Sequence, residues 1–279
     1  MNRFEGYYIK CNNNETAIAV IFGRAKSKSE KKAFIQVITP DKTYNAEYNY
    51  DDFVLIKEPF ILSIGPNKVS FESMSVKIDN IEGNVTFGEF TPIRYDIMGP
   101  FKYFPFMECR HTIVSMHHTV SGDFSVDGQS INFENGTGYI EGDRGKSFPK
   151  KYFWTQYNNN EISISASCAK IPYLGMRFTG TICIVHHEGH EYRLATYLGA
   201  RLKEFTANRL VVKQGKKRLE VEVLTPDENM QQLAAPTHGK MTRTITESIQ
   251  TTVRYRFIIK GKTLFDTTST QAAYEYSET

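Results

Sequence analysis

The chain contains a single tryptophan, four scattered cysteines and almost no stretch with helical periodicity. Because no two cysteines stand at Cys-x-x-Cys spacing, free buried thiols in a reducing compartment are favoured over disulfides. No stretch reaches the ~18 to 20 consecutive apolar residues that a membrane-spanning helix needs. The N-terminal residues have no apolar run of signal-peptide length. The sequence therefore predicts a soluble, cytoplasmic protein.

An excess of charge of one sign is also missing. The 34 basic and 31 acidic residues give a formal net charge of +3, which is too small to indicate a nucleic-acid-binding surface. We therefore expect no nucleic-acid partner.

Aromatic residues and strand patterns are abundant. The chain carries 19 Phe and 16 Tyr, which favour strands. Turn signals such as VDGQS at 126–130 and KGK at 260–262 join neighbouring strand-like runs, as hairpins require. Apolar and polar residues alternate in Met74–Ile78, Ile162–Ala166, Leu219–Val223 and Val253–Ile259. The pattern predicts an all-β fold of antiparallel strands.

The spread of strands suits two barrels of similar size. A chain of 279 residues is long enough for two domains. The NGTG step at Asn135–Gly138 is the favoured junction because its glycines tolerate a turn. We predict two tandem antiparallel lipocalin-like β-barrels, an N-terminal one at 1–135 and a C-terminal one at 136–279. A barrel of about eight strands can enclose one small ligand.

The segment Gly136–Asn158, GTGYIEGDRGKSFPKKYFWTQYN, concentrates residues suited to chemistry. On a face that looks into a barrel, its acids would favour their protonated form, and one could donate a proton near neutral pH. On an outward face they would be solvated acids beside two lysines, and its aromatic residues would be plain core. Because side chains alternate along a strand, two sets share a face: Tyr139, Glu141 and Asp143 before the turn, and Tyr152, Trp154 and Gln156 after it.

Two apparent ligand motifs are rejected. GDRGKS lacks the first glycine of a phosphate-binding loop, since position 140 is Ile140, and Pro149 stands where a helix should begin. His186, His187 and His190 surround a Glu-Gly turn with no further ligand, which favours a solvated hairpin tip over a metal site. We expect no metal and no cofactor.

A second candidate group lies at Glu108–His118. An uninterrupted strand here places His111, Ser115 and His117 on one face. The pattern is equally consistent with an interior polar pair of a histidine and an acid and with a structural histidine at position 111. For His117 the structural interpretation is favoured.

Several strings resemble the signature of the tocopherol cyclase family. In that family an acidic strand, a glycine-containing turn, a Phe-Pro step and a Trp-x-Trp-x-Gln strand follow one another, as in the central segment here. The opening FEGYYIK and AIAVIFG, the block Gly99–Gly122, the stretch LAAPTHGKM at Leu233–Met241 and the closing TLFDTTSTQAAYEYSE are similar to the family's other blocks. The resemblance covers nearly the whole chain.

The resemblance implies two lipocalin-like barrels and a lipophilic, prenylated ligand, with transient membrane contact for ligand uptake. The family's named reaction closes a chromanol ring from a prenyl hydroquinone: an acid protonates an alkene, and the phenolic oxygen traps the cation. By position, the resemblance assigns the acid to Glu141 or Asp143, the walls facing the cation to Trp154 and Tyr139, the phenol-orienting group to Gln156, and a second polar cluster to Glu108 and His111.

Two positions depart from the family pattern. Arg144 stands where the family's turn usually has a Trp, and Tyr152 replaces the first Trp of Trp-x-Trp. Fewer indoles stabilise a cation less, and Arg144 is suited to a carboxylate or phosphate on a different ligand. The leading hypothesis is an acid-promoted cyclase or hydratase. The alternatives are a carrier of a hydrophobic ligand and an interaction module whose barrel is filled by its own side chains.

Overall fold

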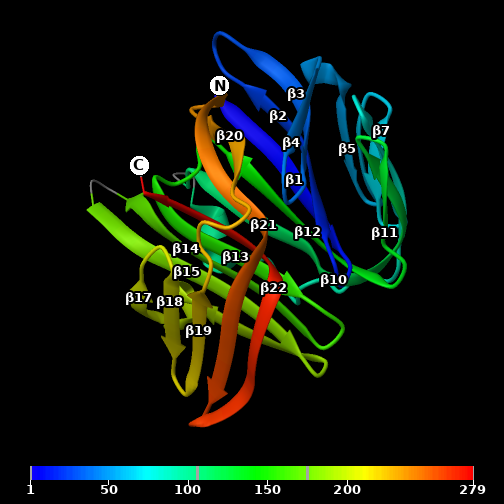
Figure 1. The fold of residues 1–279 in the computed structure, drawn as a ribbon. Coiled ribbons are helices and arrows are strands. Elements are labelled where there is room, and N and C mark those ends of the chain that lie inside the picture. Colours follow the sequence, from blue (N-terminus) through cyan, green and yellow to red (C-terminus); the bar gives the residue numbers. More distant parts are fainter. Residues whose placement is uncertain (1, 105–106, 174–175, 279) are drawn as a thin grey trace. The chain divides into compact units, whose positions relative to one another are not determined.

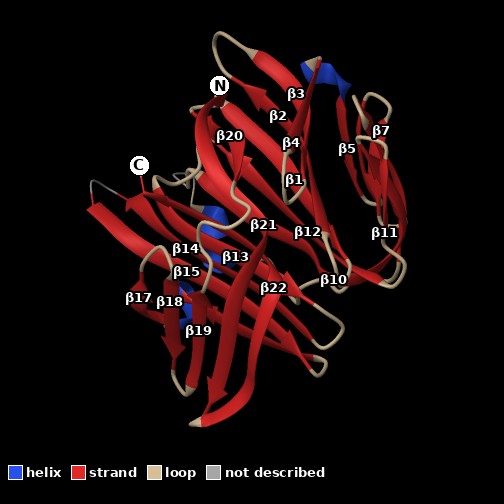
Figure 2. Ribbon diagram, viewed as in Figure 1, coloured by secondary structure: helices blue, strands red, loops and turns tan. Residues whose placement is uncertain are grey.

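The computed structural model describes residues 2–104, 107–173 and 176–278. Within these ranges strands β1 to β22 form two antiparallel sheets (Figure 1, Figure 2). Three short 3₁₀ helices interrupt them, η1 (Tyr50–Asp52), η2 (Gly99–Tyr103) and η3 (Thr196–Leu198). The predicted all-β, antiparallel fold is confirmed. Among the described residues, no helix is both long and apolar enough to cross a membrane.

The first sheet has twelve strands, with β12 in its interior between β1 and β10. Its order is β4 (Thr43–Tyr48), β3 (Lys31–Ile38), β2 (Ala17–Lys26), β1 (Arg3–Asn12), β12 (Gly136–Gly145), β10 (Cys109–Val126), β9 (Ile81–Phe87), β8 (Ser73–Ile78), β7 (Asn67–Ser70), β6 (Phe60–Ile64) and β5 (Phe53–Lys57), and β11 (Gln129–Asn132) pairs with β10.

The second sheet has ten strands, with β13 between β14 and β22. Its order is β16 (His190–Ala195), β15 (Met176–His187), β14 (Ile162–Tyr173), β13 (Lys151–Asn158), β22 (Lys262–Glu278), β21 (Lys240–Ile259), β19 (Lys217–Val223), β18 (Arg209–Gln214) and β17 (Arg201–Phe205), and β20 (Gln231–Thr237) pairs with β21.

Each sheet curls around an apolar core of its own, because strands from both ends of each ladder contribute to one cluster. In the first sheet the core includes Ile9, Phe53 and Ile140. In the second it includes Phe153 and Phe257. Burying a side chain of this size stabilises a fold by roughly 1.5–3 kcal/mol, so each cluster contributes strongly to the stability of its own sheet.

The four cysteines are free thiols, and three of them, Cys11, Cys168 and Cys183, are buried. Burial raises the pKa of Cys11 and of Cys183 to about 12. Thiols of this kind stay protonated and unreactive near neutral pH. The prediction of free buried thiols is confirmed for these three residues.

The chain crosses between two compact units more than once. The predicted boundaries, 1–135 and 136–279, differ from this division, because β12 begins at Gly136 and pairs with β1 and β10 of the first sheet. Asn135 does make a turn, with φ of 58°, but that turn joins β11 to β12. The first unit comprises Met1–Ile93, Cys109–Phe148 and Ala234–Arg243, and the second Arg94–Glu108, Pro149–Leu233 and Thr244–Thr279.

The tip of the β20–β21 hairpin belongs to the first unit. It is hydrogen-bonded to the residues that follow β12. The backbone N–H of Phe148 donates to the carbonyl of Pro236 at 3.2 Å, and that of His238 donates to Ser147 Oγ at 2.8 Å. The Ala-Pro-Thr stretch and the Phe-Pro step, two of the strings that carry the family resemblance, are therefore hydrogen-bonded to each other.

Candidate functional site

The pairing of β12 with β1 and β10 determines which side chains lie beside Glu141 and Asp143. Asp143 lies opposite His111 of β10, and Glu141 lies opposite Ile113 of β10 and Tyr8 of β1. Directly opposed residues in an antiparallel pair project to the same side of the sheet. The histidine and both acids therefore share one face.

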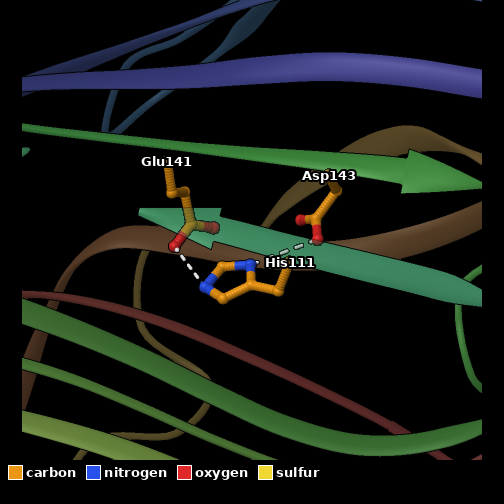
Figure 3. A group of neighbouring side chains, drawn as sticks. All are labelled: His111, Glu141 and Asp143. Atoms are coloured by element: carbon orange, nitrogen blue, oxygen red, sulfur yellow. Dashed lines mark hydrogen bonds and ion pairs between the residues drawn. The ribbon is translucent and has the colours of Figure 1, made fainter. Parts of the chain in front are cut away.

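These side chains form a connected chain of polar contacts (Figure 3). The Tyr139 hydroxyl donates to Glu141 Oε2 at 2.5 Å. His111 Nε2 lies 3.4 Å from the same oxygen, and His111 Nδ1 lies 3.1 Å from Asp143 Oδ1. The imidazole thus bridges two carboxylates, which is the arrangement of a proton relay.

Exposure increases along this chain from Glu141 to Asp143. The side chain of Glu141 is 7% exposed, that of His111 14% and that of Asp143 24%. Tyr139 is fully buried. Protons can therefore exchange with solvent at Asp143, while Glu141 is held in a nearly dry environment.

The sequence left open whether the face that carries the acids looks into a barrel interior or outward, and in the structure these acids do not point into the core of the first sheet. Ile140, their neighbour on β12, packs into the apolar cluster, so alternation directs Tyr139 and Glu141 to the opposite face. That face is nevertheless buried at both residues. The interior of this barrel-like sheet is occupied by apolar side chains, and the polar cluster lies outside it.

The cluster also has a ligand set that a metal ion could use. Atoms of His111, Glu141 and Asp143 all lie within 4.8 Å of one another. The histidine, however, meets the two carboxylates through different nitrogens on opposite edges of its ring, whereas the ligands of a metal converge on one point. The geometry fits proton transfer better than coordination.

Other residues at this face were not anticipated from the sequence. Cys109 Sγ donates to Asp143 Oδ1 at 3.3 Å. Lys10, opposite Tyr139 on β1, is fully buried. The sequence signal for a polar site here was a lysine between Ile9 and Cys11 in an otherwise apolar strand, because lysine is rarely buried without a partner.

The expected uninterrupted alternation of β10 is wrong beyond Ile113. Two irregularities in its pairing with β12 follow that residue, and they place Ser115 opposite the core residue Ile140. A β-bulge shifts the following side chains to the other face. His111 and Ser115 therefore project to opposite sides of the sheet.

His118, which sequence reasoning did not single out, is a structural histidine. The Ser115 hydroxyl donates to the carbonyl of His117 at 2.9 Å, so it accepts from His118 Nδ1 at 3.0 Å. The His118 ring packs against Phe87 and Phe90, with ring centres 4.8 and 4.5 Å away. Burial lowers the pKa of His118 to about 3, so this imidazole is neutral near pH 7.

The predicted aromatic set lies on β13 of the second unit and is buried. Tyr152 donates a hydrogen bond to Glu275 Oε1, and Trp154 is opposite the same glutamate. Gln156 Nε2 donates to Asn158 Oδ1 at 2.8 Å. Phe153, which lies between Tyr152 and Trp154 on β13, packs into the apolar core of the second unit. Tyr152, Trp154 and Gln156 therefore project to the opposite face of the sheet, as the acids do in the first unit.

Two further candidates are Arg144 and Glu108. Arg144 is exposed near the end of β12. Glu108 is half-buried and falls in the Arg94–Glu108 segment of the second unit. Both ring nitrogens of His111 contact carboxylates of β12, so Glu141 and Asp143 are polar partners of this histidine.

Comparison with known proteins agrees with the motifs. A model of the tocopherol cyclase-like family matches residues 66–277. A protein named "Probable tocopherol cyclase, chloroplastic" from Oryza sativa subsp. japonica is 29% identical over 120 residues, 40% of this chain and 25% of that protein. Tocopherol cyclase, chloroplastic, from Zea mays is 28% identical over 103 residues, 34% of this chain and 22% of that protein. The chain thus spans about a quarter of the length of these curated relatives.

Three solved structures are similar across nearly the whole chain. An AttH protein from Nitrosomonas europaea has a TM-score of 0.57 and 11% identity, and the match covers 99% of this chain and 92% of that chain. Kievitone hydratase from Nectria haematococca has a TM-score of 0.53 and 13% identity, with 99% of this chain and 89% of that chain covered. CghA with Sch210972 has a TM-score of 0.62 and 9% identity, with 99% of this chain and 88% of that chain covered. At these identities the likeness is one of fold, and it confirms the predicted lipocalin-like class.

Proposed function

The chain belongs to the tocopherol cyclase-like family, and from that premise we propose that it catalyses an acid-promoted, redox-neutral cyclisation or hydration of a lipophilic, prenylated substrate. The observation that carries the proposal is the contact chain in which Glu141 Oε2 meets both Tyr139 and His111, while the other nitrogen of His111 meets Asp143. The cytoplasmic location expected from the sequence is part of the same proposal.

The reaction adds an O–H bond across a carbon–carbon double bond. The carboxyl of Glu141 gives its proton to one alkene carbon, and the other carbon becomes a tertiary cation. An oxygen nucleophile then forms a C–O bond with the cation and releases its own proton. In a cyclisation the oxygen is a phenol of the same molecule, and in a hydration it is water. No electrons are exchanged with a cofactor.

Glu141 is the better proton donor of the two acids. Its side chain is the more buried of the two, 7% exposed against 24% for Asp143, so a proton that it receives from His111 is shielded from water. The Tyr139 hydroxyl fixes the orientation of Oε2. Asp143, which is more exposed, takes up a proton from solvent, and His111 passes it on to Glu141 after each turnover.

The substrate class follows from the family and from the chemistry. An alkene becomes a tertiary cation most readily when it is trisubstituted, as in a prenyl chain, and aromatic faces stabilise that cation. The names of the two plant relatives, tocopherol cyclases, support a prenylated phenol.

A Glu141→Gln variant tests the assignment. The amide keeps the size of the side chain and can still accept from Tyr139, but it cannot donate a proton to carbon. We expect the variant to retain its fold by circular dichroism and to lose at least about 10²-fold in turnover of a prenylated hydroquinone. The matched control is Asp123→Asn, an exposed acid on β10 of the same sheet.

Three outcomes discriminate between the candidate functions. Turnover that survives in Glu141→Gln would falsify the acid assignment. Wild-type protein that binds the hydroquinone without converting it would favour a carrier. A wild-type protein that neither binds nor converts apolar probes would favour an interaction module.

A further inference from the structure

Two short 3₁₀ helices of the second unit present large apolar side chains to solvent. Tyr103, at the end of η2, is 77% exposed, and Leu198, at the end of η3, is 44% exposed. Ring contacts connect the two helices, because Phe101 of η2 lies 5.9 Å from Tyr197 of η3 between ring centres. Phe101 also packs 5.8 Å from Phe104. We call Phe101, Lys102, Tyr103 and Leu198 the aromatic patch.

A buried arginine anchors the segment that leads into the patch. Arg193 of β16 donates to the carbonyls of Tyr95 at 2.8 Å and Asp96 at 3.0 Å. Its guanidinium lies 3.6 Å from the centre of the Tyr95 ring and 3.2 Å from Glu191. Because Arg193 is almost completely buried, these contacts hold the segment firmly on the second unit.

A second contact fixes the segment just before η2 against η3. The Tyr197 hydroxyl donates to the carbonyl of Ile97 at 2.8 Å. Gly99, with φ of 52°, lets the chain pass close to the Tyr197 ring, since an added Cβ would lie 2.6 Å from it. The patch is therefore held in place before any partner binds, so little conformational entropy is lost on docking.

The chemistry of the patch is that of a membrane interface. Tyr103 combines an apolar ring with a hydroxyl, and the Lys102 ammonium lies 5.0 Å from that ring. Tyrosine and lysine gather where acyl chains meet lipid headgroups, because their apolar parts enter the acyl region and their polar ends stay in water. Lys102 adds attraction to anionic headgroups.

The small size of the patch argues against a protein partner. A stable protein–protein interface buries about 800 Å² on each side, whereas this patch consists of four side chains on two single turns. Binding to a bilayer surface scales with the apolar area that is buried and with attraction to anionic lipids, so a patch of this size is suited to weak, reversible binding.

We propose that the aromatic patch docks the protein reversibly on the surface of a phospholipid bilayer. The sequence led us to expect membrane contact for ligand uptake, and the patch gives that contact a place on the second unit. Its use in collecting a prenylated substrate from the bilayer rests on the proposed function. The docking itself does not.

Co-sedimentation with substrate-free vesicles tests the docking. We use vesicles of phosphatidylcholine mixed with phosphatidylglycerol and compare the wild type with the double variant Tyr103→Ser, Leu198→Ser. Both side chains are exposed, so the fold should survive. We expect the double variant to bind on the order of tenfold more weakly. The matched control Leu224→Ser, which removes a 48% exposed leucine outside the patch, should bind like the wild type.

Lipid composition provides a second measurement. Lys102→Gln should weaken binding to the phosphatidylglycerol-containing vesicles about fivefold and leave binding to pure phosphatidylcholine vesicles unchanged. Glu141→Gln should bind vesicles like the wild type, so a failure of the catalytic proposal would not be mistaken for a failure of docking.

Two results would overturn the proposal. One is equal vesicle binding by the wild type and the double variant. The other is a wild type that ignores vesicles but self-associates in a way that the double variant abolishes, which would assign the patch to a protein contact.

Discussion

At the scale of single residues, two of the histidines of β10, His111 and His118, have opposite electrostatic surroundings. His111 bridges two carboxylates. His118 is buried against Phe87 and Phe90, and its pKa is lowered to about 3 by burial first and by His117 second. Near neutral pH the His118 ring is neutral and serves packing, whereas His111 is placed to carry a proton.

The buried His118 makes stability depend on acidity. In the unfolded chain this histidine titrates near 6.5, but in the folded chain it titrates near 3. Between these values the unfolded state binds more protons, so stability falls as the pH falls. We expect this residue to lower the free energy of unfolding by about 2 kcal/mol from pH 6 to pH 4. Urea unfolding at both pH values should show a smaller loss in His118→Gln, and equal losses in the two proteins would contradict the assignment.

Alternation along a strand was enough to place Tyr139, Glu141 and Asp143 on one face. The hydrogen bond from Tyr139 to Glu141 and the contacts of His111 with both acids agree with that placement. The choice of His111 as their partner could not be made from the sequence. It depends on how β10 aligns with β12, whose contacting residues are 32 positions apart, and local patterns carry no information on that alignment.

At the scale of elements, the two irregularities in β10 decide which side chains reach the polar face. The sequence predicted a single alternation through His111, Ser115 and His117. In the structure each irregularity inserts an extra residue into β10. An extra residue moves the side chains that follow it to the other face of the sheet, as far as the next irregularity. Bulges of this kind follow from pairing across the sheet, so the run of residues alone does not reveal them.

The β20–β21 hairpin tip supplies a prediction at the same scale. Gly239 has φ of 74°, and an added Cβ would lie 2.2 Å from the carbonyl oxygen of Lys26. Gly261, in the β21–β22 turn, has φ of 81° but nothing within 4 Å of an added Cβ. Both alanine variants carry the strain of a positive φ, and only Gly239→Ala adds a backbone clash.

We therefore expect Gly239→Ala to be less stable than Gly261→Ala by about 1–3 kcal/mol. Faster proteolytic cleavage at the hairpin tip should accompany the loss, because the tip is displaced from the residues that follow β12. The measurements are urea unfolding and limited proteolysis of the two variants. Equal stability would mean that the tip does not rest on the first unit.

At the scale of the whole molecule, the all-β, antiparallel class followed from the sequence, but the path of the chain did not. Asn135 makes the turn that its neighbouring glycine suggested, yet β12 after it returns to the first sheet. A turn signal reports local backbone conformation and not the strand that the chain joins next. The assignment of Arg94–Glu108 to the second unit and of Ala234–Arg243 to the first likewise depends on contacts between residues far apart in the sequence.

Carrying out the reaction in heavy water measures most directly whether Glu141 delivers a proton to carbon. Carboxyl protons exchange with solvent, so each turnover of a prenylated hydroquinone by the wild type should leave a single deuterium on the former alkene carbon, detected by mass spectrometry. Glu141→Gln should form almost no deuterated product, and Asp123→Asn should form as much as the wild type. A product without deuterium, or deuterated product from Glu141→Gln at the wild-type rate, would contradict acid catalysis at Glu141.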